Sequence, residues 1–328
     1  MDKVDVPEWL RLRRERLERE SAEEGAVSRR RGSGAPPVVL SVDWDFFLWR
    51  GAEAKDEDAY LEVLAAAVEK AEEAFRREWF PNDAVGGDPR RPLDGGAARR
   101  VYALQLFDWG HDEFWNPALL EFVWRARREA FERLGLDPRV VAGYRGLAPV
   151  AFLEAVLARF DVSRAPLLYA DSHCRGFEAL RHARPGARVV HFDAHHDCGY
   201  VAEALEREAE AGVADCGSWL HHAARVGLVD DLEVVYPEWR GPEQAPPVAP
   251  PASRFSRTTW AEWSEREAPL VKARVDAVFL ARSGSWTPPW FDGDFLNFML
   301  SWPADRCECV DCAEGAVPGR DACQAREV

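Results

Sequence analysis

Short apolar runs recur along the chain and alternate with segments of helical periodicity. The runs have the length and the Val, Leu and Ala content of buried strands, and most of them end in polar residues. This rhythm over residues 38–300 predicts an α/β fold, with one mostly parallel sheet and helices on both of its faces. The predicted strands are 38–47, 100–107, 165–170, 187–190, 232–237 and 275–283, and the predicted helices are 56–79, 117–134, 148–160, 201–211 and one that starts after Asp215 or Ser218.

The two ends of the chain differ from this pattern. Residues 7–24 are rich in Arg, Glu and Leu, and a segment with Arg, Gly and Pro follows at 28–37. These features predict a charged helix and a linker; a solvated helix and a partner-binding element both fit them. We therefore divide the chain into an N-terminal segment, 1–37, a main domain, 38–300, and a Cys-containing tail, 301–328.

One segment combines a buried strand with three residues of metal-binding types. The apolar run 187–190 leads into H-F-D-A-H-H-D, in which Asp193, His195 and Asp197 alternate along the chain. Because side chains alternate between the faces of a strand, these three are expected to point the same way. A buried carboxylate is costly unless it is paired or bound to a cation. We therefore favour a metal site over a strand that ends in water.

Two more predicted strands end in residues of the same kinds. Asp43 and Asp45 share one face at the end of the first strand, and His173 follows the strand 165–170. Parallel sheets gather ligands beyond the carboxyl ends of their strands, so the three strand ends are expected to converge. Four carboxylates and two imidazoles without a thiolate suit two Mn²⁺ ions, and less specifically Zn²⁺ or Fe²⁺. Two such ions would lower the pKa of a bridging water and supply hydroxide near neutral pH.

The overall composition limits the classes of binding partner that the protein is expected to have. Asp and Glu total 57 against 42 Lys and Arg, and the resulting net charge of −15 disfavours nucleic acid and suits a cationic substrate. The sequence has no apolar run of membrane-spanning length and no signal-peptide pattern. We therefore expect a cytoplasmic protein that does not act at a membrane; a homo-oligomer is compatible with this sequence.

Four of the seven cysteines lie near the C-terminus. An odd number of cysteines without a secretory signal argues against a disulfide framework. The C-x-C-x-x-C arrangement could hold a structural zinc, but its spacing is not one of the common zinc patterns, and we favour reduced thiols. These residues are Cys307, Cys309, Cys312 and Cys323.

Several motifs resemble those of a known superfamily. D-A-H-H-D at 193–197 is similar to the D-A-H-x-D motif of the ureohydrolases, the arginase and agmatinase group, and S-V-D-W-D at 41–45 is similar to their S-x-D-x-D motif. The chain most resembles an arginase-like subfamily that includes the peptide arginases of ribosomal-peptide maturation. The segments that carry this closer resemblance are 191–197, 217–219, 234–239 and the D-x-D-F-F of 43–47, within a thin similarity over most of the main domain.

The resemblance implies an arginase-like three-layer α/β/α fold, a binuclear manganese centre and hydrolysis of a guanidino group to urea and an amine. In peptide arginases an arginine side chain of a precursor peptide becomes ornithine. The S-x-D-x-D motif usually follows D-A-H-x-D in the family but precedes it here, which indicates a circular permutation. By resemblance, Asp193 and Asp43 would bridge the ions, His173 and Asp197 would complete one ion, and His195 and Asp45 the other.

No motif places the guanidinium-binding acid or the proton-shuttle histidine of this family. Acids in loops at strand or helix ends are candidates to hold the cationic group, and a helix N-terminus that uses them to satisfy its dipole is the alternative. His221 and His111 are candidates to protonate the leaving amine, and Trp219 is a candidate peptide contact. The candidate acids are Asp108, Asp112, Glu113 and Asp215.

Two classes of function follow from these features. The first is a Mn²⁺-dependent hydrolase that acts on arginine side chains of a precursor peptide, or on another C–N bond in free arginine, agmatine or an acylated amine. The second is a non-catalytic metal- or peptide-binding protein of the same fold, which the 14 tryptophans would suit. Metal content and turnover of an Arg-containing peptide separate the two.

Overall fold

A seven-stranded sheet forms the centre of the protein, and all of its neighbouring strands are parallel. The structure, a computed structural model, describes residues 4–5, 36–50, 142–144, 147–284, 287 and 289–310. Across the sheet the strands are β10 (Arg254–Thr259), β9 (Val229–Tyr236), β7 (Ala187–Phe192), β2 (Val38–Asp43), β12 (Ala277–Ala281), β6 (Pro166–Ala170) and β13 (Arg306–Cys309).

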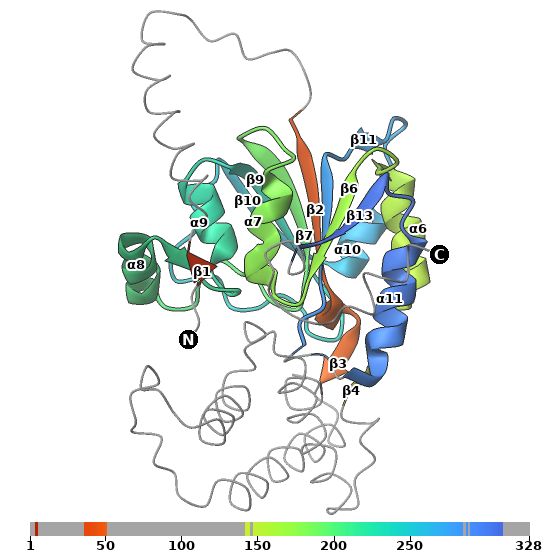
Figure 1. Cartoon of the computed structure of the whole chain (residues 1–328), viewed down its shortest axis with the longest axis horizontal. Helices are drawn as coiled ribbons and strands as arrows, with labels where there is room; N and C mark the ends of the chain where they lie inside the picture. Colours follow the sequence, from red (N-terminus) through yellow and green to blue (C-terminus); the bar gives the residue numbers. More distant parts are fainter. Residues whose placement is uncertain are drawn as a thin grey trace, which may run out of the picture.

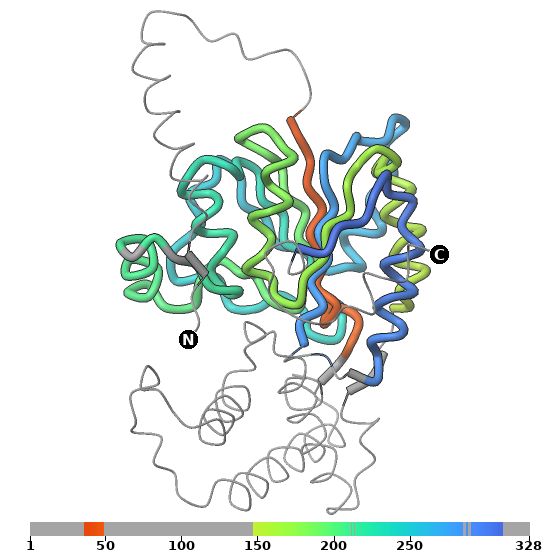
Figure 2. The backbone as a smooth tube through the Cα atoms, in the orientation of Figure 1, coloured from red at the N-terminus to blue at the C-terminus, as the bar shows by residue number. Residues whose placement is uncertain are grey.

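Strand β2 lies in the middle of this sheet although it comes first in the chain. Figure 2 shows it in orange between green and blue segments from much later in the sequence. It pairs with β7 on one side, where Ser41 lies opposite His191, and with β12 on the other, where Asp43 lies opposite Ala281. This pairing brings the ends of β2 and β7 together. It is compatible with a circular permutation but does not test it.

Helices pack on both faces of the sheet and enclose two separate apolar cores (Figure 1). Side chains of β2 alternate between the cores: Val39 belongs to one, and Leu40 and Val42 belong to the other. The prediction of an α/β fold with helices on both faces of a parallel sheet is confirmed. Helices α7 (Phe177–Leu180) and α9 (Trp219–Arg225) cover one face; α6 (Pro149–Arg159), α10 (Trp260–Glu265) and α11 (Asp292–Ser301) cover the other.

Smaller elements surround this sheet. Three two-stranded sheets join β1 with β8, β3 with β4, and β5 with β11. In the described part of the chain, no helix has the length and apolar character needed to cross a membrane. The remaining elements are β1 (Val4–Asp5), β3 (Leu48–Arg50), β4 (Ala142–Tyr144), β5 (Phe160–Asp161), β8 (Val213–Ala214), β11 (Ala273–Arg274), α8 (Ala202–Ala211), and the 3-10 helices η2 (Trp44–Phe46), η4 (His173–Gly176) and η5 (Pro289–Phe291).

The sheet extends past the predicted end of the main domain at residue 300. Strand β13 lies in the predicted tail and forms one edge of the sheet, while β10 forms the other. Both sequences are polar, R-C-E-C and R-F-S-R-T-T, because an edge strand is only partly buried and lacks the apolar signature of a central strand. Helices α10 and α11 were also not predicted. The predicted elements at 7–24, 56–79, 100–107 and 117–134 lie outside the described residues.

Candidate metal centre

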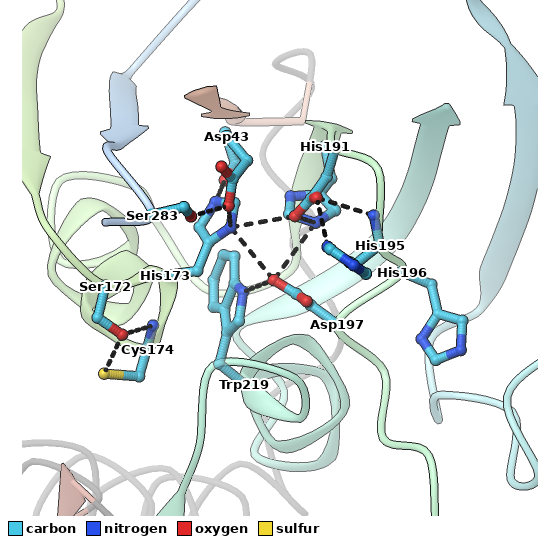
Figure 3. A network of polar contacts seen from close by, with 12 residues as sticks. Asp43, Ser172, His173, Cys174, His191, His195, His196, Asp197, Trp219 and Ser283 are labelled. Carbon is cyan, nitrogen blue, oxygen red and sulfur yellow. Dashed lines mark hydrogen bonds and ion pairs between the residues drawn. The ribbon is translucent and has the colours of Figure 1, made fainter. Parts of the chain in front are cut away.

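All six residues predicted as metal ligands gather at the carboxyl ends of β2, β6 and β7. Figure 3 shows the ring of His173 and the carboxylates of Asp43 and Asp197 pointing toward one another, whereas His196 points away from them. Two of the six, Asp43 and Asp193, are 3% and 1% exposed, so the cluster is a buried one. Charged groups of this kind are buried only when they are paired or bound to a cation.

His173 stands at the centre of three carboxylates. Its Nδ1 lies 2.9 Å from Asp43 Oδ2, 3.1 Å from Asp193 Oδ2 and 3.3 Å from Asp197 Oδ2. The other ring nitrogen, Nε2, lies 2.9 Å from Ser41 Oγ. One imidazole nitrogen carries one proton at most and cannot satisfy three acceptors, so this arrangement suits a cation among the carboxylates.

A second group forms around His195. Its Nδ1 lies 3.1 Å from Asp45 Oδ2 and 3.4 Å from Asp193 Oδ1. Asp193 thus uses one oxygen in the His173 group and the other in the His195 group. Both groups have the composition and compactness of a metal site, and Asp193 is the residue that they share.

His191 belongs to the first group and was not among the predicted ligands. Its Nε2 lies 3.0 Å from Asp193 Oδ2 and 3.5 Å from Asp197 Oδ2. The donor atoms of His173, His191, Asp193 and Asp197 all lie within 4.8 Å of one another. The sequence could have indicated this ligand. His191 lies two residues before Asp193, so its side chain is expected on the same face of the strand.

The ligands converge through turns and not through the strand pleat that the sequence argument assumed. Strand β7 ends at Phe192 and β2 ends at Asp43, so the later ligands lie in loops or in η2. In each D-x-D or D-x-H motif the first Asp accepts from the backbone N–H two residues on: Asp45 N to Asp43 Oδ1 is 2.9 Å, and His195 N to Asp193 Oδ1 is 2.8 Å. This local hydrogen bond is typical of Asp and turns the second side chain back beside the first.

Backbone strain is concentrated at this site. Among the described residues other than glycine, only Asp197 and Ser283 have positive φ, at 50° and 52°. Asp197 is one of the clustered carboxylates, and Ser283 donates from its Oγ to Asp43 Oδ2. Such conformations persist where surrounding contacts over-determine them, and they are concentrated at functional sites.

Electrostatic interactions and burial within the cluster raise the pKa values of two of its histidines and two of its aspartates. Burial lowers the pKa of His173, but the attraction of the carboxylates, Asp43 first, outweighs it and raises that pKa well above its usual value. The pKa of His195 is raised in the same way, mainly by Asp45. Burial, followed by repulsion from neighbouring carboxylates, raises the pKa of Asp45 and of Asp197. A cation that binds here would therefore displace protons.

The residues present fit a metal. Within the described structure, His173 Nδ1, His191 Nε2 and Asp193 Oδ2 are buried with no hydrogen-bond partner, although they approach one another closely. Convergent lone pairs without hydrogen-bond geometry are what a metal site presents. Mixed carboxylate and imidazole donors suit Mn²⁺, Fe²⁺ or Zn²⁺.

The other predicted site residues are placed differently. Trp219 is fully buried, and its indole donates to Asp197, so it supports the cluster from behind and offers no exposed surface to a peptide. His221 lies on α9, where its ring contacts that of His222, and no described interaction links it to the cluster. Asp215 lies just before α9, and its backbone N–H donates to Ser218 Oγ. Asp108, His111, Asp112, Glu113, Cys312 and Cys323 lie outside the described residues, while Cys307 and Cys309 lie in β13.

No family model matches the chain, and neither a curated protein nor a solved structure is similar enough to count as a match. The function is therefore inferred from the geometry of the site together with the sequence motifs.

Proposed function

We propose that the protein is a binuclear metallohydrolase of the arginase type. The observation that carries this proposal is the position of Asp193, whose two oxygens take part in two separate metal-type groups. A carboxylate shared in this way is the usual bridge between two ions, and two ions balance the charge of four carboxylates. In this proposal His173 and Asp197 would hold one ion, His195 and Asp45 would hold the other, and Asp43 and Asp193 would be shared by both.

The bound ions would supply a polarised, easily deprotonated water. The chain's own residues prepare the site for this. Ser41 Oγ lies 2.9 Å from His173 Nε2 and can accept a hydrogen bond from a proton on that nitrogen. The other ring nitrogen, Nδ1, would then be free to bind an ion. Trp219 Nε1 donates to Asp197 Oδ2 and holds the carboxylate toward the cluster. Ser283 Oγ does the same for Asp43.

For the substrate we propose the guanidino group of arginine side chains in a precursor peptide, which would become ornithine with release of urea. The net charge of −15 favours a cationic substrate. The D-A-H-H-D and S-V-D-W-D motifs, which resemble those of ureohydrolases, favour guanidino hydrolysis over other reactions of two-metal sites.

The test is to incubate the Mn²⁺-loaded protein with an Arg-containing peptide. We expect urea and a loss of about 42 Da per arginine, the mass of CN₂H₂, at a residue that then behaves as ornithine. Asp193→Asn, which keeps the shape but removes the shared charge, is the matched inactive control. Turnover of free arginine or agmatine alone would move the substrate to a small molecule, and turnover of an acylated amine would change the bond.

A protein that binds metal but turns over none of these substrates would contradict the hydrolase proposal. It would then be a non-catalytic metal- or peptide-binding protein. If the protein binds no metal at neutral pH after Mn²⁺ loading, the metal centre itself is contradicted.

A further inference from the structure

We propose that His191 is a seventh ligand of the metal centre and makes its two sites unequal. His191 Nε2 would bind the ion held by His173 and Asp197, which with the shared Asp193 would give that ion four protein ligands besides Asp43. The ion of Asp45 and His195, with the shared Asp193, would have three besides Asp43, which lies between the two ions in the proposed centre. This inference rests on the proposed metal centre and is independent of which bond the protein hydrolyses.

The position of His191 matches that of the expected ligand His173. The two rings lie 4.8 Å apart, centre to centre, and each turns one nitrogen toward Asp193 Oδ2, at 3.1 Å for His173 Nδ1 and 3.0 Å for His191 Nε2. Neither nitrogen makes a well-directed hydrogen bond to that oxygen. Both nitrogens therefore face the space that the carboxylates also face.

A structural role in the core does not account for His191. Its side chain is 0% exposed, and within the described residues neither ring nitrogen has a hydrogen-bond partner. An unsatisfied buried polar group costs about 1–3 kcal/mol, and buried histidines normally have partners.

Its place in the fold makes His191 a rigid ligand. It lies on β7 opposite Ser41 of β2, inside the sheet, whereas most of the other ligands lie in turns beyond the strands. A donor on a paired strand is held by the backbone hydrogen bonds on both sides, so little conformational entropy is lost when a metal binds.

As a consequence, the two metal sites would differ in affinity and in access to substrate. Besides the shared Asp43, the first site has four buried donors, so its coordination would be closed, as in a structural metal site. The second has three donors besides Asp43, and its His195 side chain is 15% exposed, so solvent or substrate could reach an ion bound there. We expect the first site to fill first and hold its ion more tightly, and the second to be the one that substrate approaches.

The experiment is a calorimetric titration of the metal-free full chain with Mn²⁺. We expect two resolved steps for the wild type. His191→Gln and His191→Phe should both weaken the tight step by about 100-fold or more, because even residues that only support a ligand contribute 10- to 100-fold. His195→Gln should weaken the second step and leave the first within a few-fold. His182→Gln, the same change at an exposed histidine, is the control and should leave both steps unchanged.

A second measurement uses the wild type and is independent of how the variants fold. With one equivalent of Mn²⁺ bound, pulsed electron paramagnetic resonance should detect two coupled imidazole nitrogens, from His173 and His191. One coupled nitrogen would overturn the proposal.

The other outcomes are equally decisive. Tight binding kept in His191→Gln but lost in His191→Phe would make His191 a hydrogen-bond donor to Asp193, and unchanged binding in both would make it a core residue; either overturns the proposal while the metal centre stands. A wild type that binds no Mn²⁺ would overturn both the metal centre and this inference.

Discussion

The indole Nε1 of Trp219 donates a hydrogen bond of 3.0 Å to Asp197 Oδ2. The backbone joins the same elements, because Leu220 N donates to Asp197 O at 3.1 Å. The indole ring also stacks on His173, with ring centres 5.8 Å apart and planes at 26°. One buried side chain on α9 thus orients two of the proposed ligands, His173 of η4 and Asp197 of the loop after β7.

Trp219→Phe is expected to weaken Mn²⁺ binding by 10- to 100-fold. Phe keeps most of the buried ring and its stacking on His173 but removes the donor to Asp197, and the loss of a residue that orients a ligand has an effect of this size. Calorimetric titration of the metal-free protein measures it. Trp263→Phe, a change at a buried tryptophan in the core on the other face of the sheet, is the control. Equal affinities in both variants would contradict the role of the indole N–H.

Gly199→Ala is expected to destabilise the protein more than Gly212→Ala does. Both glycines have positive φ, +87° and +69°, where a side chain costs about 1–2 kcal/mol. A Cβ at Gly199 would also lie 2.5 Å from Leu205 Cδ2, whereas a Cβ at Gly212 meets nothing within 4 Å. The clash should add about 1–3 kcal/mol in the loop that follows Asp197. Urea unfolding measures the difference between the variants, and equal losses would mean that Leu205 moves aside without cost.

Arg282→Met is expected to cost about 2 kcal/mol or more of unfolding free energy. The Arg282 guanidinium binds Asp171 at 2.8 Å and Asp292 through two contacts of 2.9 and 3.0 Å, and its side chain is only 18% exposed. Removal of the cation leaves the carboxylates of Asp171 and Asp292 without the guanidinium that balances their charge. It also loosens the segment that presents Ser283 to Asp43.

The control for this change is Arg181→Met, which breaks an ion pair with Glu178 on the surface. Arg181 is 53% exposed, and such pairs contribute about 0–1 kcal/mol. Chemical denaturation of the two variants in parallel gives the comparison. A loss in Arg282→Met no larger than that in Arg181→Met would contradict the structural role of Arg282.

His221 is expected to make stability fall as the pH falls below 6.5. Burial, and then the neighbouring His222, lower the pKa of His221 to about 4, and its side chain is 6% exposed. In the unfolded chain it takes up a proton below about pH 6.5, whereas the folded protein does not until about pH 4. The stabilisation is therefore present above pH 6.5 and is lost toward pH 4, by up to about 3 kcal/mol.

The measurement is the free energy of urea unfolding at several pH values between 4 and 7, in EDTA so that metal release does not contribute. His221→Leu should show a shallower decline than the wild type over this window. Parallel curves for the two proteins would show that His221 titrates normally in the folded state.

Much of the central domain could be predicted from local patterns. The helices α6 and α8 and the central strands follow from periodicity and from Val, Leu and Ala content, which are properties of short segments. The clustering of the six ligand candidates followed from a general rule, that the ends of parallel strands meet at one edge of the sheet. The edge strands β10 and β13 were not predicted, because their burial depends on neighbours far away in sequence.

The amino-acid sequence was enough to identify the residue types that could form a metal site and the strands at whose ends they would lie. The tertiary structure alone decided how they meet: Asp45 joins through a 3-10 turn, Asp197 through a left-handed backbone, and His191 through its position inside the sheet. It also revealed the supports, Trp219 and Ser283. The physical reason is that these contacts join segments far apart in the chain, so they depend on packing and hydrogen bonds that no local propensity encodes.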